Sequence, residues 1–466
     1  MGGFALSRLV AVSNRVAQPR KGKASGGLAV GIWSALQRHG GVWFGWSGRT
    51  ADTEPGEPKV VRSGKVKFVM TDLNEREYEL YYNGFSNDTL WPLFHFMLGY
   101  FKYSRAQYNA YCRVNEFFAR KLYPLLEEGD LIWVHDYHLI PLGGELRRAG
   151  VESPIGFFLH VPFPGFDVIR SLPCYEPILR RLSLYDVVGF QTERDLWAFQ
   201  DCLTQPEIGG AILADGRVCA FGRTFRAEVF PIGIDVDDCA TLAVDNMKHT
   251  KVRRLADSIG GRQLIIGVDR LDYSKGLELK FRAFEELLAN YPATRGRVSF
   301  LQIAPPTRAG VRTYDEIRAN LEQVSGNVNG RFADIDWVPI RYLNQGYDRQ
   351  LLMSLFRLAS VGLVTPIRDG MNLVAKEYLA SQDPDDPGVL VLSTLAGAAS
   401  ELTAAVLVNP YDMSGVADGI QCAIEMPVEE RRERHQEMLS VLRDNDIHAW
   451  CESFLSVLSH AGREQA

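Results

Sequence analysis

The order of hydrophobic runs along the chain is the feature that most restricts its fold. Short runs rich in β-branched and aromatic residues alternate with longer amphipathic stretches, which is typical of βαβ units around a parallel sheet. A first series holds LVAVSN (9–14), LIWVHD (131–136), PIGFFLH (154–160), VVGFQT (187–192) and EVFPIG (228–233). A second series holds LIIGVDR (264–270), VSFLQIAP (298–305), DIDWVP (334–339), VGLVTP (361–366), GVLVLS (388–393) and AVLVNP (405–410). The sequence therefore predicts an α/β protein in which one theme is used twice.

The length of the chain supports two domains. Its 466 residues exceed what one hydrophobic core usually supports. A polar stretch, Asp235–Arg262, separates the two series, so we place the domain junction there. We predict a first domain over residues 1–238, a second over 239–440 and a C-terminal helix over 441–466.

Charge and cysteine content argue against several classes of protein. The formal net charge of −6 is unfavourable for nucleic acid, because binding to the phosphate backbone normally needs a basic face. The seven cysteines include no CxxC pair and no metal-like spacing, which suits reduced thiols. No apolar run approaches the roughly 20 residues of a membrane helix, and no small-residue cleavage site follows the first hydrophobic run. We expect a cytoplasmic protein without a signal peptide or membrane partner.

Charged and polar residues follow strands in both series. Arg15, Asp136 and His160 follow strands of the first series, and Arg270 and Lys275 follow the first strand of the second. In open parallel sheets ligands bind beyond the carboxyl ends of the strands. Any one of these residues could be satisfied by a neighbouring backbone group, but their number predicts a ligand cleft between two domains.

The stretch LVTPIRDGMNLVAKEY (363–378) predicts a strand, a glycine turn and a helix. Gly370 would allow a close approach of backbone to ligand, and the helix that starts near Asn372 would aim its positive dipole end at an anion. Arg270 and Lys275 would add full charges in the same domain. An acidic ligand with phosphate groups fits this arrangement best.

Two further features leave alternatives open. Glu377 lies further along the predicted helix, where it could reach a hydroxyl-rich group such as a ribose or could be a plain surface residue. Gly26 and Gly27 precede a predicted helix, so they form either a second phosphate cradle or a simple turn.

Metal and hydrolase chemistry find little support in the sequence. Asp-x-Asp spacing occurs at several scattered places, which suggests chance and no catalytic metal. The motifs GxSxG, HExxH and GxxxxGKS are absent.

A series of longer motifs carries a family resemblance. These are SNRV, SGGLAVG, WFGWSG, IWVHDYHL, GFFLHVPFP, GFQTERD, FPIGID, RLDYSKGL, QIAPPTR and TPIRDGMNLVAKEY, in this order. From about Arg8 to the final helices, the chain resembles the trehalose-6-phosphate synthase family of retaining glycosyltransferases. The resemblance implies the GT-B fold, in which two Rossmann-like domains face each other across a cleft and the C-terminal helix crosses back to the first domain.

The resemblance also implies an activity. Family members transfer glucose from a nucleotide diphosphate glucose, usually UDP-glucose, to glucose 6-phosphate. The products are α,α-trehalose 6-phosphate and UDP, and the configuration is retained without a metal or other cofactor.

On the donor side, the resemblance assigns residues to the diphosphate, to the glucose and to the ribose. Arg270, Lys275, Gly26 and Gly27 would hold the diphosphate; Asp369, Gly370, Met371 and Asn372 the glucose hydroxyls; Leu373 and Val374 would offer N–H groups to phosphate; and Glu377 would bind the ribose.

On the acceptor side, the resemblance assigns Arg15 and Arg308 to the sugar phosphate. Trp46, Tyr82 and Trp91 would form the walls, although both tryptophans could instead be core residues. The residues expected at the reaction centre are Asp136, His160, Arg270, Lys275 and Asp369. The sequence offers no obvious second carboxylate as a covalent nucleophile. The resemblance implies attack at the front face through an oxocarbenium-like state, in which the leaving phosphate helps to take the acceptor proton.

Two other functions are compatible with the sequence. A glucosylglycerol-phosphate synthase would use a smaller phosphorylated acceptor, and a non-catalytic sensor would bind sugar phosphate and nucleotide sugar without turnover. The sequence is compatible with a homo-oligomer and with UDP, GDP or ADP as the donor nucleotide.

Overall fold

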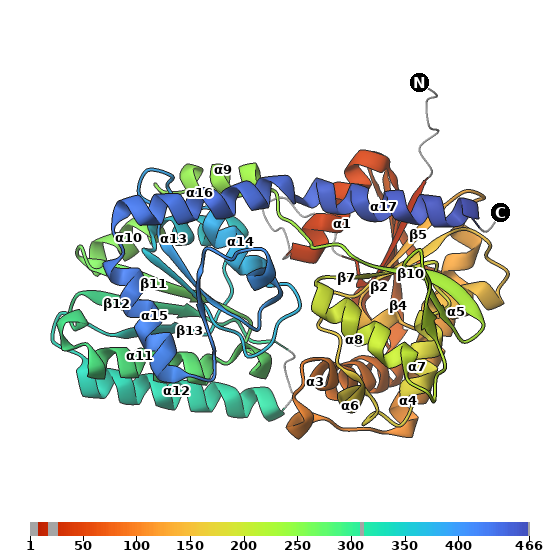
Figure 1. Cartoon of the computed structure of the whole chain (residues 1–466), viewed down its shortest axis with the longest axis horizontal. Coiled ribbons are helices and arrows are strands. Elements are labelled where there is room, and N and C mark those ends of the chain that lie inside the picture. Colours follow the sequence, from red (N-terminus) through yellow and green to blue (C-terminus); the bar gives the residue numbers. More distant parts are fainter. Residues whose placement is uncertain (1–7, 17–26, 308–311, 465–466) are drawn as a thin grey trace. The chain divides into compact units, whose positions relative to one another are not determined.

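The chain forms two compact α/β units in a computed structural model that describes residues 8–16, 27–307 and 312–464 (Figure 1). The first unit contains the described residues up to Ile232, together with those from Ile447 onward. The second unit contains Gly233–Asp446. Each unit is built on its own sheet, which confirms the predicted α/β class and the repeated theme.

The sheet of the first unit has a parallel centre and antiparallel edges. Among the described residues its strand order is β3-β4-β2-β1-β5-β6-β7-β10-β9-β8, and only the pairs β3–β4, β9–β10 and β8–β9 are antiparallel. The central strands are almost wholly buried, which explains their continuous hydrophobic runs. The strands are β1 (Leu9–Arg15), β2 (Gly41–Ala51), β3 (Lys59–Ser63), β4 (Val66–Asn74), β5 (Leu131–His135), β6 (Ile155–Phe158), β7 (Val187–Phe190), β8 (Ala211–Ile212), β9 (Val218–Ala220) and β10 (Arg223–Val229).

The helices of the first unit include one segment of uncommon type. The segment η1 (Glu79–Leu90) is a π-helix, a form that is rare and often found at functional sites. The α-helices are α1 (Gly27–His39), α2 (Glu75–Tyr78), α3 (Trp91–Phe94), α4 (Arg105–Leu122), α5 (Leu142–Arg148), α6 (Phe166–Ile169), α7 (Tyr175–Leu182), α8 (Glu193–Thr204) and α17 (Ile447–Glu464).

The C-terminal helix α17 completes the core of the first unit. The ring of Phe454 stacks on Trp133 of β5, with centroids 4.7 Å apart. A Cβ at Gly156 would lie 2.7 Å from the Phe454 ring, and one at Gly189 would lie 2.9 Å from it. The two glycines therefore give the helix its close approach to the sheet.

Within the described residues, the second unit has a six-stranded sheet in which all pairs are parallel, in the order β13-β12-β11-β14-β15-β16. In Figure 1, α11, α12 and α15 lie on one side of this sheet, and α10, α13, α14 and α16 lie on the other. Its strands are β11 (Gln263–Val268), β12 (Val298–Ile303), β13 (Ile340–Leu343), β14 (Val361–Val364), β15 (Val389–Ser393) and β16 (Val406–Val408). Its helices are α9 (Val236–Asp245), α10 (Thr250–Ile259), α11 (Leu277–Asn290), α12 (Arg312–Phe332), α13 (Arg349–Leu358), α14 (Leu373–Ala380), α15 (Met413–Glu425) and α16 (Val428–Asp444).

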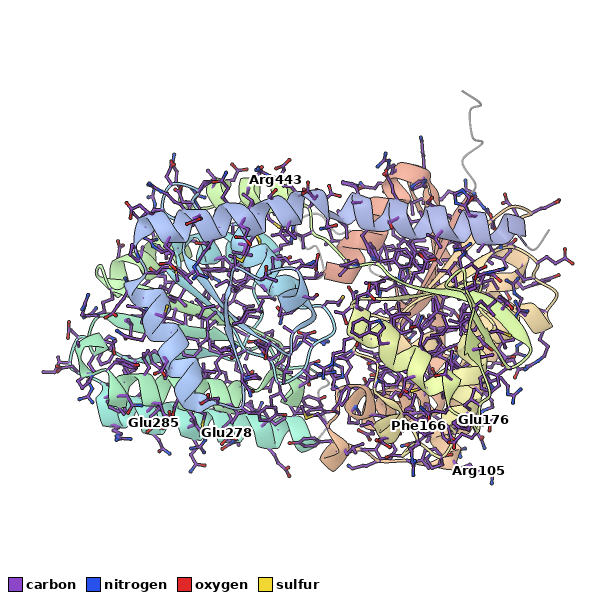
Figure 2. The ribbon with its side chains drawn as sticks, viewed as in Figure 1. Arg105, Phe166, Glu176, Glu278, Glu285 and Arg443 are labelled. Atoms are coloured by element: carbon purple, nitrogen blue, oxygen red, sulfur yellow. The ribbon has the colours of Figure 1, made fainter. Side chains whose placement is uncertain are left out.

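Polar side chains connect the two long helices on one side of this sheet. On α11, Glu278 accepts a hydrogen bond from Asn320 of α12 at 2.5 Å, and Glu285 pairs with Arg331 of α12 at 2.9 Å. Glu278 and Glu285 are labelled along this edge of the unit in Figure 2. The two helices therefore cover the sheet as one layer.

One predicted strand is wrong. The run DIDWVP (334–339) forms a turn, in which Asp334 and Trp337 make an isolated bridge, and β13 begins only at Ile340. Ile335 is fully exposed, so the alternation of polar and apolar residues there does not correspond to a buried face.

No helix in the described part of the chain is long and apolar enough to cross a membrane.

Candidate active site

In the second unit, the loops after β11 and β14 are held together by hydrogen bonds. These strands are parallel neighbours, so their carboxyl ends lie at the same edge of the sheet. The backbone N–H groups of Ile367 and Arg368 donate to the carbonyl oxygen of Ser274 at 2.9 and 3.2 Å. Lys275 Nζ lies 2.5 Å from Asp369 Oδ2. The structure thus brings together two predicted donor-site residues that are 94 positions apart in the sequence.

Asp369 also organises the start of α14. Its Oδ2 accepts a hydrogen bond from Asn372 Nδ2 at 3.0 Å, and its Oδ1 accepts one from the N–H of Met371 at 3.4 Å. Asn372 has a left-handed backbone with φ +65°, and its Oδ1 caps the N–H of Ala375 at 3.2 Å. A left-handed non-glycine residue is strained, and such strain is concentrated at functional sites. The predicted helix N-terminus is therefore present and capped by a predicted site residue.

The backbone around Gly370 is closely packed. A Cβ at Gly397 would lie 1.9 Å from the carbonyl oxygen of Gly370, so the two segments need a glycine at that contact. Leu373 and Val374 form the first turn of α14. The first N–H groups of a helix have no intrahelical acceptor, and they carry the positive end of its dipole. These groups are suited to bind a phosphate oxygen.

The other described donor-side residues lie on the same two segments of the chain. Arg270 is exposed just after β11. Glu377 lies on α14 with its side chain 17% exposed, and its Oε1 is 3.4 Å from Arg349 Nε. Burial raises the pKa of Glu377, while the positive charge of Arg349 opposes that rise.

In the first unit, Arg15, Trp46 and Tyr82 form one cluster. Arg15 and Trp46 are opposite each other on β1 and β2, and the guanidinium carbon lies 5.9 Å from the Trp46 ring centroid. The Trp46 ring is 6.0 Å from that of Tyr82, which belongs to η1. Gly48, with φ +86°, passes so close that a Cβ there would lie 2.7 Å from Arg15 Nε. The cluster combines a cation with flat apolar walls, which suits a phosphorylated sugar.

Asp136 and His160 lie at the ends of neighbouring strands. Asp136 follows β5 and has the strained backbone angles φ 78° and ψ 162°. Its Oδ1 accepts a hydrogen bond from the backbone N–H of His160 at 3.3 Å, just after β6. Two predicted residues of the reaction centre are therefore in direct contact.

His160 is buried beside a second histidine. His135 Nδ1 lies 3.2 Å from His160 Nε2, and both rings pack near Trp450 of α17. Burial lowers the pKa of His160 to about 3, and it lowers the pKa of His135 well below its ordinary value. Both rings are therefore neutral near pH 7, and His160 is available there as an uncharged hydrogen-bonding group.

The two predicted wall tryptophans are buried, at 7% exposure for Trp46 and 5% for Trp91. The Trp91 ring packs on the rings of His95 and Tyr137, with centroid distances of 4.0 Å and 5.8 Å. Tyr137 in turn contacts His138. Trp91 therefore supports the aromatic cluster through Tyr137, a role that combines core packing with placement of the site.

The structure describes all but two of the predicted site residues. Gly26 and Arg308 lie outside the described residues, and Gly27 is described only as the first residue of α1. Within the described ranges, no group of three or more His, Cys, Asp or Glu side chains has an arrangement that could hold a metal ion.

Sequence reasoning missed several residues that belong to these clusters. The ring centroids of Tyr78 and Tyr82 are 5.3 Å apart, and the His138 ring also stacks on Tyr82, at a centroid distance of 5.6 Å. The four-residue spacing of Tyr78 and Tyr82 would have indicated a shared helical face. No local signal indicates that Arg349 contacts Glu377, because the two are 28 positions apart.

Known proteins of the same architecture resemble the chain over nearly its full length. A model of glycosyltransferase family 20 matches residues 9–460. A trehalose-6-phosphate synthase of Sinorhizobium fredii is 49% identical over 458 residues, which is 97% of this chain and 98% of the relative.

Two solved structures are similar in both sequence and shape. One is an α,α-trehalose-phosphate synthase (UDP-forming) of Burkholderia xenovorans in complex with glucose-6-phosphate, with 49% identity, a TM-score of 0.93 and coverage of 97% and 100% of the two chains. The other is an E. coli protein bound with UDP-2-fluoro glucose, with 48% identity, a TM-score of 0.94 and coverage of 97% and 99%. These similarities confirm the predicted GT-B fold, and the chain belongs to glycosyltransferase family 20.

Proposed function

We propose that the chain is a retaining glucosyltransferase that moves glucose from UDP-glucose to glucose 6-phosphate, forming α,α-trehalose 6-phosphate and UDP. The observation that carries this proposal is the Lys275–Asp369 pair at the capped N-terminus of α14. At this place the Lys275 ammonium and the first N–H groups of α14 can bind a diphosphate. The Asp369 carboxylate can accept hydrogen bonds from sugar hydroxyls. The relatives that bind glucose-6-phosphate and UDP-2-fluoro glucose support the choice of substrates.

On the donor side, catalysis requires stabilisation of the departing nucleotide. Negative charge grows on the diphosphate as the glycosidic bond breaks, and groups fixed in place beforehand stabilise that charge most effectively. Arg270, Lys275 and the N–H groups of Leu373 and Val374 supply this stabilisation. Asp369 and Asn372 hold the transferred glucose.

On the acceptor side, Arg15 binds the phosphate of glucose 6-phosphate while Trp46 and Tyr82 flank the sugar. Asp136 contacts the hydroxyl region of the acceptor. Neutral His160 forms a hydrogen bond with a hydroxyl of the transferred glucose. Attack occurs on the face from which the nucleotide leaves, with an oxocarbenium-like transition state. A leaving phosphate oxygen accepts the proton of the acceptor hydroxyl.

A matched set of donors and acceptors tests this function. The protein is incubated with UDP-, GDP- or ADP-glucose and with glucose 6-phosphate or glycerol 3-phosphate, and nucleotide release and the glycoside product are measured. UDP release with formation of α,α-trehalose 6-phosphate is the expected result. Release only with glycerol 3-phosphate would identify a glucosylglycerol-phosphate synthase, and tight binding without turnover would identify a sensor.

A further inference from the structure

A buried arginine on α13 contacts Glu377 of α14. Arg349 is the first residue of α13, and its Nε lies 3.4 Å from Glu377 Oε1. Both side chains are mostly buried, at 13% exposure for Arg349 and 17% for Glu377. At such depth water screens the charges poorly, so the contact acts on Glu377 more strongly than a surface pair would.

The guanidinium of Arg349 is fixed from a second side. Its Nη1 pairs with the carboxylate of Asp238 on α9, and its Nη2 donates to Cys239 Sγ at 3.0 Å. Asp348, just before Arg349, caps α13 by accepting a hydrogen bond from the N–H of Leu351 at 2.8 Å. The planar fork of an arginine can serve such separate partners at once, which a lysine ammonium does not do with the same geometry. Arg349 therefore has little freedom to turn away from Glu377.

This contact affects the charge and orientation of Glu377. Burial raises the pKa of the carboxyl group, whereas the adjacent guanidinium lowers it. An ionised carboxylate offers about four acceptor sites, but a protonated one loses part of that capacity and becomes a donor. With Arg349 on Oε1, the carboxylate keeps further acceptor sites for other donors.

We propose that Arg349 is a positioning residue for ribose recognition, which holds the Glu377 carboxylate in the orientation that accepts a hydrogen bond from the 2′-hydroxyl of the donor ribose. This inference rests on the proposed function, in which Glu377 binds the ribose. Arg349 itself acts through Glu377. Loss of Arg349 should weaken the binding of nucleotides that carry the ribose 2′-hydroxyl more than the binding of nucleotides that lack it.

The test compares UDP with 2′-deoxy-UDP in calorimetric titrations of the full chain at pH 7.5. A hydrogen bond to a charged group discriminates by about tenfold to a hundredfold, so wild-type protein should bind UDP tighter by about that factor. In Arg349→Gln the UDP affinity should fall by about tenfold or more while the 2′-deoxy-UDP affinity changes little. The ratio of the two affinities should approach one. Arg349→Lys should keep an intermediate ratio, and it also provides a folded variant if the glutamine substitution proves unstable.

Arg357→Gln is the matched control. Arg357 lies on the same helix and pairs with Asp383 at 2.7 Å, but it does not belong to the donor-site residues. This variant also removes a partly buried ion pair of α13. It therefore shows how the loss of an ion pair on this helix, away from Glu377, affects nucleotide affinity. Its UDP to 2′-deoxy-UDP ratio should equal that of the wild type.

A double substitution separates the two possible failures. Glu377→Gln should abolish the discrimination between UDP and 2′-deoxy-UDP. Adding Arg349→Gln to it should cause no further loss of UDP affinity, because the two side chains act as one unit.

A wild-type affinity ratio in Arg349→Gln, or equally weakened binding of both nucleotides, would overturn the role of Arg349 while leaving the proposed function intact. A wild-type protein that forms trehalose 6-phosphate but does not distinguish the two nucleotides would overturn the ribose role of Glu377 and this inference with it. Absence of UDP binding by the wild type would overturn the proposed function itself.

Discussion

Two lysine–aspartate pairs of the second unit have similar geometry but different surroundings. Lys275 lies 2.5 Å from Asp369, with side-chain exposures of 10% and 12%. Lys280 lies 2.6 Å from Asp269, with exposures of 0% and 4%, and Gln302 Nε2 also donates to Asp269 at 3.2 Å. The first pair is next to the N-terminus of α14, and the second lies inside the unit. We therefore expect the first to serve binding and the second to serve folding.

Substitution of each lysine tests this distinction. Lys275→Ala should lower kcat/KM for UDP-glucose by at least about 100-fold, because a transition-state charge loses its counter-ion. Lys280→Ala should lower the free energy of unfolding by about 3–5 kcal/mol, because it leaves a buried carboxylate unpaired. Steady-state kinetics and urea denaturation measure the two effects. An active Lys275→Ala enzyme would remove Lys275 from the diphosphate site.

The histidine pair of the first unit should make stability depend on pH. Unfolded histidine protonates near pH 6.5, whereas the pKa of folded His160 is about 3 and that of His135 is also lowered. Between these pH values the unfolded state binds more protons, so the free energy of unfolding falls as the pH drops below about 6.5. Each histidine contributes a slope of up to about 1.4 kcal/mol per pH unit.

His135→Asn isolates one of these contributions. Urea denaturation between pH 4.5 and 6.5 should show a slope about 1.4 kcal/mol per pH unit shallower than in the wild type, because one proton uptake is removed. Parallel stability curves for the two proteins would show that His135 does protonate in the folded state.

At the scale of elements, α17 is a structural part of the first unit although it is the last helix of the chain. Phe454 stacks on Trp133 and packs edge-on against Phe158 and Phe230. Trp450 of the same helix lies near His135 and His160. The helix therefore links the core of the first unit to two histidines at the candidate site.

Truncation of one side chain of α17 measures how much the helix contributes to the stability of the first unit. Phe454→Ala should lower the free energy of unfolding of the first unit by about 3–5 kcal/mol, because it leaves a cavity against the sheet. Glu452→Ala is the control, since Glu452 is an exposed partner of Arg38 and such pairs contribute about 0–1 kcal/mol. Both are read from denaturation followed by tryptophan fluorescence. Equal stability of the two variants would mean that α17 does not contribute to the core.

At the scale of the whole molecule, the two units should respond to different substrates. UDP should slow amide hydrogen exchange mainly in residues 270–276 and 369–377 of the second unit, because bound ligand lowers the frequency of local opening. Glucose 6-phosphate should slow exchange mainly near residues 46–48 and 78–82 of the first. Mass spectrometry of peptides measures both patterns. Protection of the opposite units would reverse the assignment of donor and acceptor sides.

Several features of the molecule were determined by the sequence alone. The two series of hydrophobic runs predicted the α/β class and the repeated theme, because strand and helix periodicities are local properties of the chain. The motif TPIRDGMNLVAKEY predicted a helix that starts near Asn372, and in the structure α14 begins at Leu373 with Asn372 as its N-cap. The run DIDWVP shows the limit of this reasoning, because alternation alone does not tell which face of a segment will be covered.

Only the tertiary structure decided which distant residues touch. The order of parallel strands places Lys275 against Asp369, and the π-helix η1 brings the Tyr82 ring near the rings of both Trp46 and His138. Neither contact has a local signature, since it depends on which strands become neighbours and on how one helix packs against a sheet. Local preferences therefore fix the elements, whereas the burial of their apolar faces against one another fixes the partners of their polar side chains.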